Sequence, residues 1–170
     1  MQATPKLQEI VTQLATKHNV DLDKPGAYLR LEMPGHGQLV IQNIGAERIS
    51  VTNYLQPTRD WVADPEIVVL VDSVPDEDTP RGVGRVWTPI ESTELFGGWR
   101  LYAELDSRGD LVVYDAAGQM ELARYADNVV AHNLVVHGWL EQAERSTTPI
   151  HTWTDEEMLA RDVRFDDVPF

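Results

Sequence analysis

The sequence predicts an α+β fold, in which an antiparallel sheet of about six or seven strands carries an N-terminal helix and a long C-terminal helix packed on it. Two patterns of apolar residues with helical spacing lie at residues 5–18 and 119–144. Between them, short apolar segments are separated by turns rich in glycine and proline. This order of elements favours an antiparallel meander with helices on one face.

The first helix is predicted from Pro5 to His18. Thr4 is a suitable N-cap residue, and proline fits the first helical position. His18 falls in the last turn, where a positive charge interacts favourably with the helix dipole. Asn19 suits the left-handed conformation that ends many helices. The apolar stripe of this helix comprises Leu7, Ile10, Val11, Leu14 and Ala15.

Short segments with strand character fill the middle of the chain. Residues 56–65 and the acidic residues 75–80 are predicted loops. The unbroken apolar run within residues 66–74 is typical of a central strand covered on both faces. The last two segments form a predicted hairpin. The predicted strands are residues 27–33, 39–44, 49–55, 66–74, 82–90, 99–105 and 111–114.

The second helix is predicted from about Gly118 to Glu144. It places Asn133 on the apolar face, where a buried amide must form hydrogen bonds and fixes how the helix docks. Gly138 interrupts the pattern and brings Trp139 close to a neighbouring element. Asn133 and Trp139 are therefore predicted structural residues. The inward stripe comprises Leu122, Ala126, Val129, Val130, Asn133, Val136 or His137, and Leu140.

Length and composition predict one α+β domain at residues 1–146 and an acidic extension at residues 147–170, with a short helix from Thr154. Cysteine is absent, which excludes disulfides, cysteine-ligated zinc and thiol nucleophiles. The apolar runs are too short to span a membrane, and residues 1–6 show no signal-peptide pattern. We therefore expect a cytoplasmic protein without membrane contact.

The chain is strongly acidic. It has 28 Asp and Glu residues against 14 Lys and Arg residues, a formal net charge of −14. This balance opposes direct binding of nucleic acid, because phosphate contacts require basic side chains. Three roles stay open: solubility or adaptation to salt, docking of a basic protein partner, and imitation of DNA.

Three carboxylates cluster at Asp60, Asp64 and Glu66. Such a cluster could hold a hard cation or supply an acid–base pair. In the alternative interpretation, Asp60 and Asp64 bond their own backbone as turn-formers, and Glu66 begins a strand. His36, in a glycine-rich turn, is a weaker candidate base without an identifiable partner. No catalytic residue, metal ligand or cofactor is predicted.

Aromatic residues in the predicted sheet and its loops form either a core or an open binding surface. The aromatic residues are Tyr54, Trp61, Trp87, Trp99 and Tyr102. The predicted binding residues are Tyr54, Asp60, Trp61, Asp64 and Glu66.

Several of these stretches together resemble one family. They are residues 54–56 with 60–68, the helix at 121–140, residues 28–31 and residues 87–90. The combination is similar to an uncharacterised bacterial family, domain-of-unknown-function family 6908, over roughly residues 27–141. The pair before Gly138, valine and histidine, departs from the polar pair usual there.

This resemblance implies no established activity, cofactor or catalytic residue. It implies that such domains are small and intracellular and are often encoded near plasmid or phage genes. We therefore expect a non-enzymatic binding or regulatory module that acts on a basic protein partner, encoded on a mobile element. The alternatives are a small divalent-metal-dependent enzyme that uses Asp60, Asp64 and Glu66, and a DNA-mimic inhibitor of a nucleic-acid-binding protein. The oligomeric state stays open.

Overall fold

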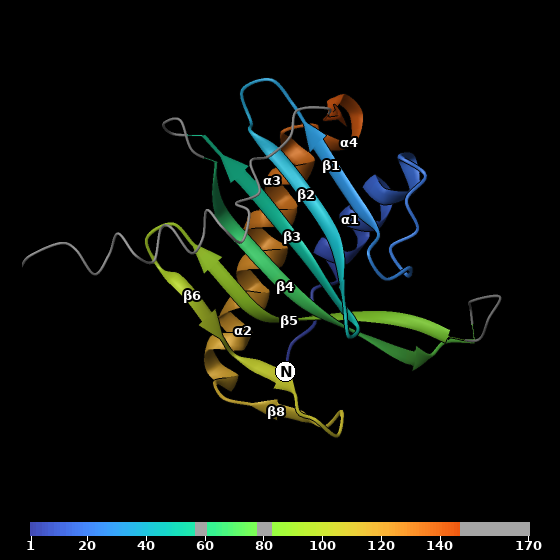
Figure 1. Cartoon of the computed structure of the whole chain (residues 1–170), viewed down its shortest axis with the longest axis vertical. Coiled ribbons are helices and arrows are strands. Elements are labelled where there is room, and N and C mark those ends of the chain that lie inside the picture. The colour runs from blue at the N-terminus through green and yellow to red at the C-terminus, as the bar shows by residue number, and fades with distance from the viewer. Residues whose placement is uncertain (57–60, 78–82, 147–170) are drawn as a thin grey trace, which may run out of the picture.

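The computed structural model describes residues 1–56, 61–77 and 83–146. Their central feature is a seven-stranded antiparallel sheet with the order β6-β5-β4-β3-β2-β1-β9 (Figure 1). The strands are β1 (Tyr28–Glu32), β2 (Gln38–Gly45), β3 (Arg48–Leu55), β4 (Val62–Pro75), β5 (Val83–Glu94), β6 (Gly98–Leu101) and β9 (Glu144–Arg145). A separate two-stranded sheet joins β7 (Ala103–Leu105) to β8 (Leu111–Val113).

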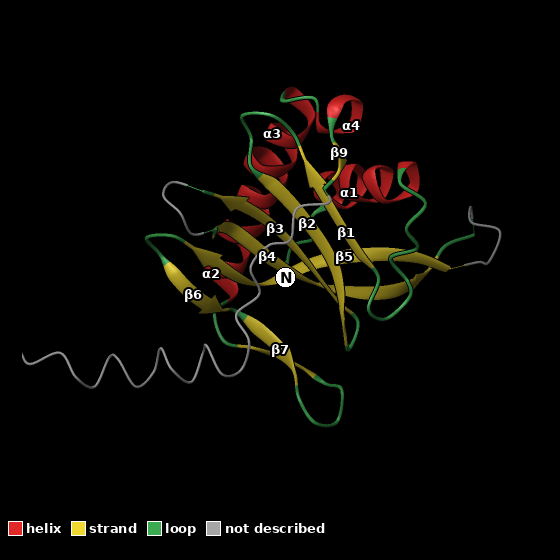
Figure 2. Cartoon of the chain, turned by 45° about the horizontal axis from the view of Figure 1, so that its top comes forward, coloured by secondary structure: helices red, strands yellow, loops and turns green. Residues whose placement is uncertain are grey.

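The helices are α1 (Pro5–Lys17), α2 (Ala116–Tyr125), the π-helix η1 (Ala126–Val130), α3 (Ala131–Val136) and α4 (Trp139–Gln142). The segments α2, η1 and α3 follow one another without a break and form one long helix, residues 116–136. This helix and α1 lie against the same face of the sheet (Figure 2). The predicted α+β architecture is therefore confirmed. Within the described residues, no helix is long and apolar enough to cross a membrane.

Some predictions fall outside the described residues. These are the position of Asp60, the extension at residues 147–170 with its helix from Thr154, and the end of the acidic loop at residues 78–80. The division into a domain at residues 1–146 and an extension stays a prediction.

Several strand boundaries differ from the prediction: β5 continues to Glu94 instead of ending at residue 90, residues 144–145 form β9, and two further differences have a clear cause in the pairing. Residues 62–65, expected in a loop, belong to β4, because Leu55 pairs with Val62 and Tyr54 with Ala63. The strand expected at residues 99–105 divides at Tyr102. The amide of this buried tyrosine donates to the Ile90 carbonyl, and its own carbonyl accepts from two residues after β8. Backbone pairing, which the local pattern does not reveal, decides both boundaries.

The main core lies between the sheet and the two long helices. It unites the α1 stripe with alternate residues of β1 to β5, including Ile41, Val69 and Trp87, and with Leu134 of α3. On the opposite face, Val68, Leu70 and Ile90 form a smaller cluster with Ala103 of β7. Both faces of the central strand β4 are thus buried, which explains its unbroken apolar sequence.

The N-terminus of α1 is capped by a residue from the other long helix. Thr4 occupies the N-cap position, but its hydroxyl forms no cap and donates to the Trp87 carbonyl at 3.2 Å. The first free amides of α1, those of Lys6 and Leu7, donate instead to Oδ1 of Asp127, at 3.1 and 3.0 Å. A carboxylate here satisfies amides that have no partner within the helix and also complements the helix dipole.

A second polar contact joins the same two elements. Gln119, fully buried on α2, accepts from the Gln2 amide at 2.9 Å and donates to the Gln2 carbonyl at 2.8 Å. Its amide nitrogen also donates to the Pro89 carbonyl of β5 at 3.1 Å. The chain entering α1 is therefore tied to both the long helix and the sheet.

The π-helix changes which residues of the long helix face the core. In an unbroken α-helix, Leu122, Val129 and Asn133 would share one face. The wider turn at η1 shifts the later residues, so that Ala131 and Leu134 are buried while Val129 and Asn133 are exposed. The expectation of a buried Asn133 is therefore wrong.

The long helix also ends earlier than predicted. Gly138 adopts a left-handed conformation, with φ of 76°, so the helix stops after Val136 and does not continue to Glu144. The chain turns there and places Trp139, 2% exposed, in the core. At the end of α1, Asn19 has the left-handed conformation that its identity predicts, with φ of 57°.

Removal of the shared cap should destabilise the protein. We expect Asp127→Ala to lower the free energy of unfolding by about 2 kcal/mol, because two amides at the start of α1 lose their acceptor. Asp127→Asn, which keeps an acceptor oxygen, should cost less. Urea unfolding measures both changes. Glu121→Ala, an exposed carboxylate on α2, is the matched control; equal losses in Asp127→Ala and this control would contradict the capping role.

The pKa of His18 makes stability depend on pH. Burial lowers this pKa, and the charges of Lys17 and Arg145 lower it further, so a positive charge here is disfavoured, contrary to the expectation from the helix dipole. The unfolded chain keeps a pKa of about 6.5 and binds more protons below that pH, so the free energy of unfolding should decrease as pH falls through about 6.5. His18→Gln should reduce this decrease in urea titrations at several pH values.

Candidate protein-interaction site

The turn between β5 and β6 exposes large apolar side chains. Glu94 of β5 pairs with Gly98 of β6, so residues 95–97 span the turn. Leu95 is 43% exposed, Phe96 is 97% exposed and Trp99 is 60% exposed. Single exposed apolar residues are common, but a group of them is typical of a surface that contacts another molecule. We call Leu95, Phe96 and Trp99 the β5–β6 aromatic patch.

Carboxylates surround this patch. The Asp64 side chain accepts from the Leu95 amide at 3.3 Å and so connects β4 to the turn. The Glu94 side chain lies over Gly97, where an added Cβ would be 3.1 Å from Oε2. Burial raises the pKa of Tyr125 on α2, and the negative charges of Glu94 and Asp64 raise it further. Both carboxylates therefore lie near Tyr125 as well as near the turn.

Further polar groups lie on the sheet face opposite the helices. Ser50 donates to Glu66 at 2.8 Å, and Thr52 lies 3.4 Å from the same carboxylate oxygen. Burial raises the pKa of Tyr54, and the charge of Glu66 raises it further. In the register, Glu66 pairs with Thr93, which pairs with Trp99. Cross-strand partners share a face, so Trp99 and Glu66 lie on the same side of the sheet.

The predicted binding residues that the structure describes do not form one cluster. Tyr54 and Glu66 lie together on the open face of the sheet. Asp64 bonds the Leu95 amide, and its carbonyl accepts from the Asn53 amide group at 3.2 Å. Trp61, half-buried, lines a different surface hollow beside Met33 and Gln142.

This separation bears on the metal hypothesis. Asp64 and Glu66 have different hydrogen-bond partners, and Asp60 lies outside the described residues. Across the described ranges, no group of three His, Cys, Asp or Glu residues is placed to hold a metal ion. The bond from the Leu95 amide to Asp64 matches a structural role for that carboxylate.

The aromatic residues divide between core and surface. Trp87 and Tyr102 are buried, with exposed fractions of 3% and 9%, whereas Trp99 projects into solvent. Sequence reasoning missed Phe96, which is the most exposed large apolar residue described. Its signal is a phenylalanine placed directly before two glycines, in a turn too short to bury it.

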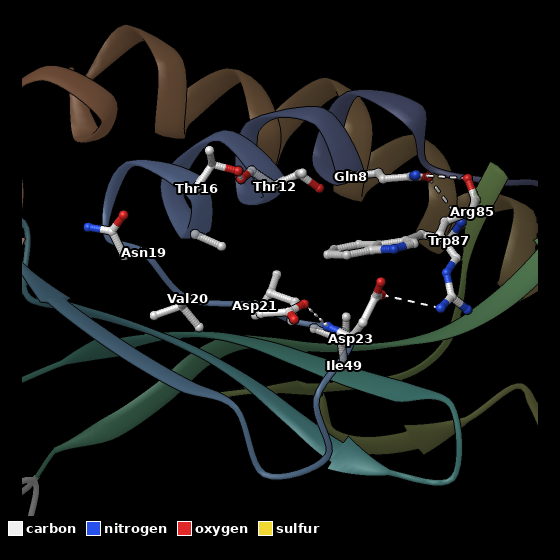
Figure 3. A pocket seen from close by; sticks show the side chains of 12 residues that line it. Gln8, Thr12, Thr16, Asn19, Val20, Asp21, Asp23, Ile49, Arg85 and Trp87 are labelled. Atoms are coloured by element: carbon white, nitrogen blue, oxygen red, sulfur yellow. Dashed lines mark hydrogen bonds and ion pairs between the residues drawn. The ribbon is translucent and has the colours of Figure 1, made fainter. Parts of the chain in front are cut away.

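A separate cleft of about 560 Å³ lies between α1 and the segment that follows it. Figure 3 shows the indole of Trp87 in this cleft, between Gln8 of α1 and Asp23. The polar groups at this end are already paired. Gln8 donates to the Arg85 carbonyl and accepts from the Trp87 amide, while Arg85 pairs with Asp23 at 3.4 Å. These bonds hold α1 on β5, so the polar side chains at this end of the cleft have a structural role.

Comparison with known families identifies the class of this chain. The model of the family described as Domain of unknown function (DUF6908) matches residues 6–93, so the chain belongs to this family. The match runs from α1 to β5 and includes the β4 motif at residues 62–68. It begins earlier and ends earlier than the expected range of 27–141, so the helix motif at residues 121–140 lies outside it. No curated protein and no solved structure matches the chain.

The effect of the Glu66 charge on the pKa of Tyr54 predicts a measurable titration. We expect Glu66→Gln to lower the pKa of Tyr54 toward its usual value, because a negative charge that opposes phenolate formation is removed. The remaining shift should persist, since burial is its larger cause. Tyrosinate absorbance, compared with that of a Tyr54→Phe variant, reports this residue. Glu104→Gln, beside Tyr114 instead, should leave Tyr54 unchanged; a Tyr54 pKa unaffected by Glu66→Gln would contradict this effect.

Proposed function

We propose that this protein is a non-enzymatic binding module that docks a basic protein partner through the β5–β6 aromatic patch. The observation that carries the proposal is the exposure of Phe96, in the β5–β6 turn, and of Trp99, in the strand that follows it. Exposed aromatic side chains are enriched at protein interfaces, where a few of them supply most of the binding free energy. In the proposed complex, Phe96 enters an apolar pocket of the partner and Trp99 packs beside it.

The charges around the patch favour a basic partner. Asp64, Glu94, Glu66 and Glu91 lie on the strands next to the turn. The ion pairs between described residues are those of Lys24 with Asp21 and Arg85 with Asp23, so none of these four carboxylates is paired with a described cation. A net charge of −14 adds long-range attraction for a basic surface and accelerates association at low salt. Arg100 of β6 offsets part of this local charge.

The protein is proposed to act in the cytoplasm, and its gene is proposed to lie on a mobile element. The absence of cysteine supports this setting, because the fold needs no oxidising compartment. The two alternative functions predict other ligands. A metal-dependent enzyme requires that a divalent cation raise the melting temperature by ligand linkage, and a DNA mimic requires that DNA compete with the protein for its partner.

Loss of the aromatic anchors should abolish partner binding without unfolding the protein. We expect Phe96→Ser combined with Trp99→Ser to weaken binding about 700-fold, because hot-spot aromatics contribute about 2 kcal/mol each and both are lost. A photocrosslinking residue at position 96 identifies the partner in a lysate of the source organism, and titration with the purified partner gives the affinity. Increasing salt should also weaken binding, mainly by slowing association.

Tyr114→Ser is the matched control, because Tyr114 is another exposed aromatic side chain, on the far hairpin. It should retain full affinity, although it removes the hydrogen bond that the Tyr114 hydroxyl donates to Glu104. If the double variant binds the crosslinked partner as tightly as the wild type does, the proposed site is wrong.

A further inference from the structure

A second pocket lies on the helix side of the sheet and is independent of the aromatic patch. Its volume is about 230 Å³, and it lies between the end of the long helix and the nearby parts of β2, β3 and β4. A space of this size holds several water molecules or one small organic ring system. Buried apolar side chains of Leu39, Val51, Leu134 and Trp139 form part of its lining.

The backbone irregularities of the long helix shape this pocket. Val130, the last residue of η1, contributes to the lining, and the register shift at η1 turns Leu134 inward and Asn133 outward to the rim. The left-handed Gly138 then places Trp139 in the pocket wall. π-helical turns are rare and occur often at functional sites.

Two histidines meet at the pocket. His36 comes from the turn between β1 and β2, and His137 is the C-cap residue of α3. Their ring centroids are 4.6 Å apart, and the ring planes are inclined by 37°. The partner that sequence reasoning did not identify for His36 is therefore another imidazole, 101 positions along the chain.

The pocket contains polar groups with unused hydrogen-bonding capacity. Within the described chain, no hydrogen bond engages the side chains of His36, Tyr125, Asn133 or His137, all of which line the pocket. Asn133 and His137 are exposed to water, and His36 and Tyr125 are half-buried, so a ligand that enters the pocket can replace the water around all four side chains. The Tyr125 hydroxyl is protonated at neutral pH, because the ordinary pKa of tyrosine is about 10 and burial raises the pKa of Tyr125 further, so the hydroxyl can donate.

The lining determines the chemistry of the ligand. Its described polar side chains are amides, imidazoles and a phenol, which donate and accept hydrogen bonds, and none is a carboxylate, ammonium or guanidinium. A charged ligand would therefore lose its hydration without gaining an ion pair with these residues. The aromatic walls of Tyr125 and Trp139 favour a flat ring.

We propose that this pocket binds a small, uncharged heteroaromatic molecule, of the size of one bicyclic ring, that has both a hydrogen-bond donor and an acceptor. The ring lies against Leu134 and Trp139, and its polar edge faces Asn133 and the histidine pair. The pocket lining contains none of Leu95, Phe96 and Trp99, so the test of this site and the test of the protein interface alter different residues and either proposal can fail without the other.

The experiment uses benzimidazole as the probe and the full chain in neutral buffer. Indane, benzoate and benzylamine serve as its apolar, anionic and cationic counterparts. We expect benzimidazole to raise the melting temperature by ligand linkage and to shift the NMR signals of the Trp139 indole N–H and the Leu134 amide. Indane, benzoate and benzylamine should bind at least about tenfold more weakly, the equivalent of one hydrogen bond.

Two variants test the site itself. Asn133→Leu, an exposed position, should weaken benzimidazole binding about tenfold and leave the fold intact. Asn128→Leu, an exposed amide on the same helix outside the lining, is the matched control and should bind normally. Leu134→Trp fills the pocket and should abolish binding. The proposal is overturned if benzimidazole leaves the Trp139 and Leu134 signals unshifted, if benzoate or benzylamine binds as tightly, or if Asn133→Leu has no effect.

Discussion

The contact on which this structure depends is the bond between a carboxylate in the π-helix and the first turn of α1. The α1 helix lacks a local cap, because the Thr4 hydroxyl is bonded to the sheet at Trp87. Asp127, on the distant long helix, supplies the missing acceptor for Lys6 and Leu7. A buried helix end without acceptors is costly, so folding of α1 is coupled to correct placement of the long helix.

This coupling has consequences along the long helix. The side chain of Asp127 must project from the long helix toward α1. At the same time, Leu122 and Leu134 of that helix must both reach the core. A regular α-helix does not satisfy these positions together, and the wider π-turn does. The same turn brings Asn133 to the rim of the small pocket. The π-turn that carries the cap of α1 therefore also shapes the pocket lined by Tyr125, Val130, Asn133 and Leu134.

The two proposed sites use different physical chemistry on different parts of the sheet. The β5–β6 aromatic patch is open, apolar and surrounded by negative charge, which suits a large basic surface. The pocket at His36 and His137 is small and lined by uncharged polar groups among apolar side chains, which suits a small uncharged molecule. The strong net charge favours binding mainly at the β5–β6 aromatic patch, because long-range electrostatic attraction requires a charged partner.

The sequence by itself determined the α+β class, α1 and its ending at Asn19, the meander and the central strand β4. These features depend on local signals, namely apolar periodicity, proline and glycine positions, and short turns. It did not separate the exposed Trp99 from the buried Trp87, because strand alternation alone does not say which face is covered. Nor did it predict that Asp64 and Glu66 have different hydrogen-bond partners, that Phe96 is exposed, or that the rings of His36 and His137 are in contact. Tertiary structure decided these points. Strand register, the π-turn and the cap at Asp127 each depend on contacts between residues far apart in the chain, and no local pattern encodes them.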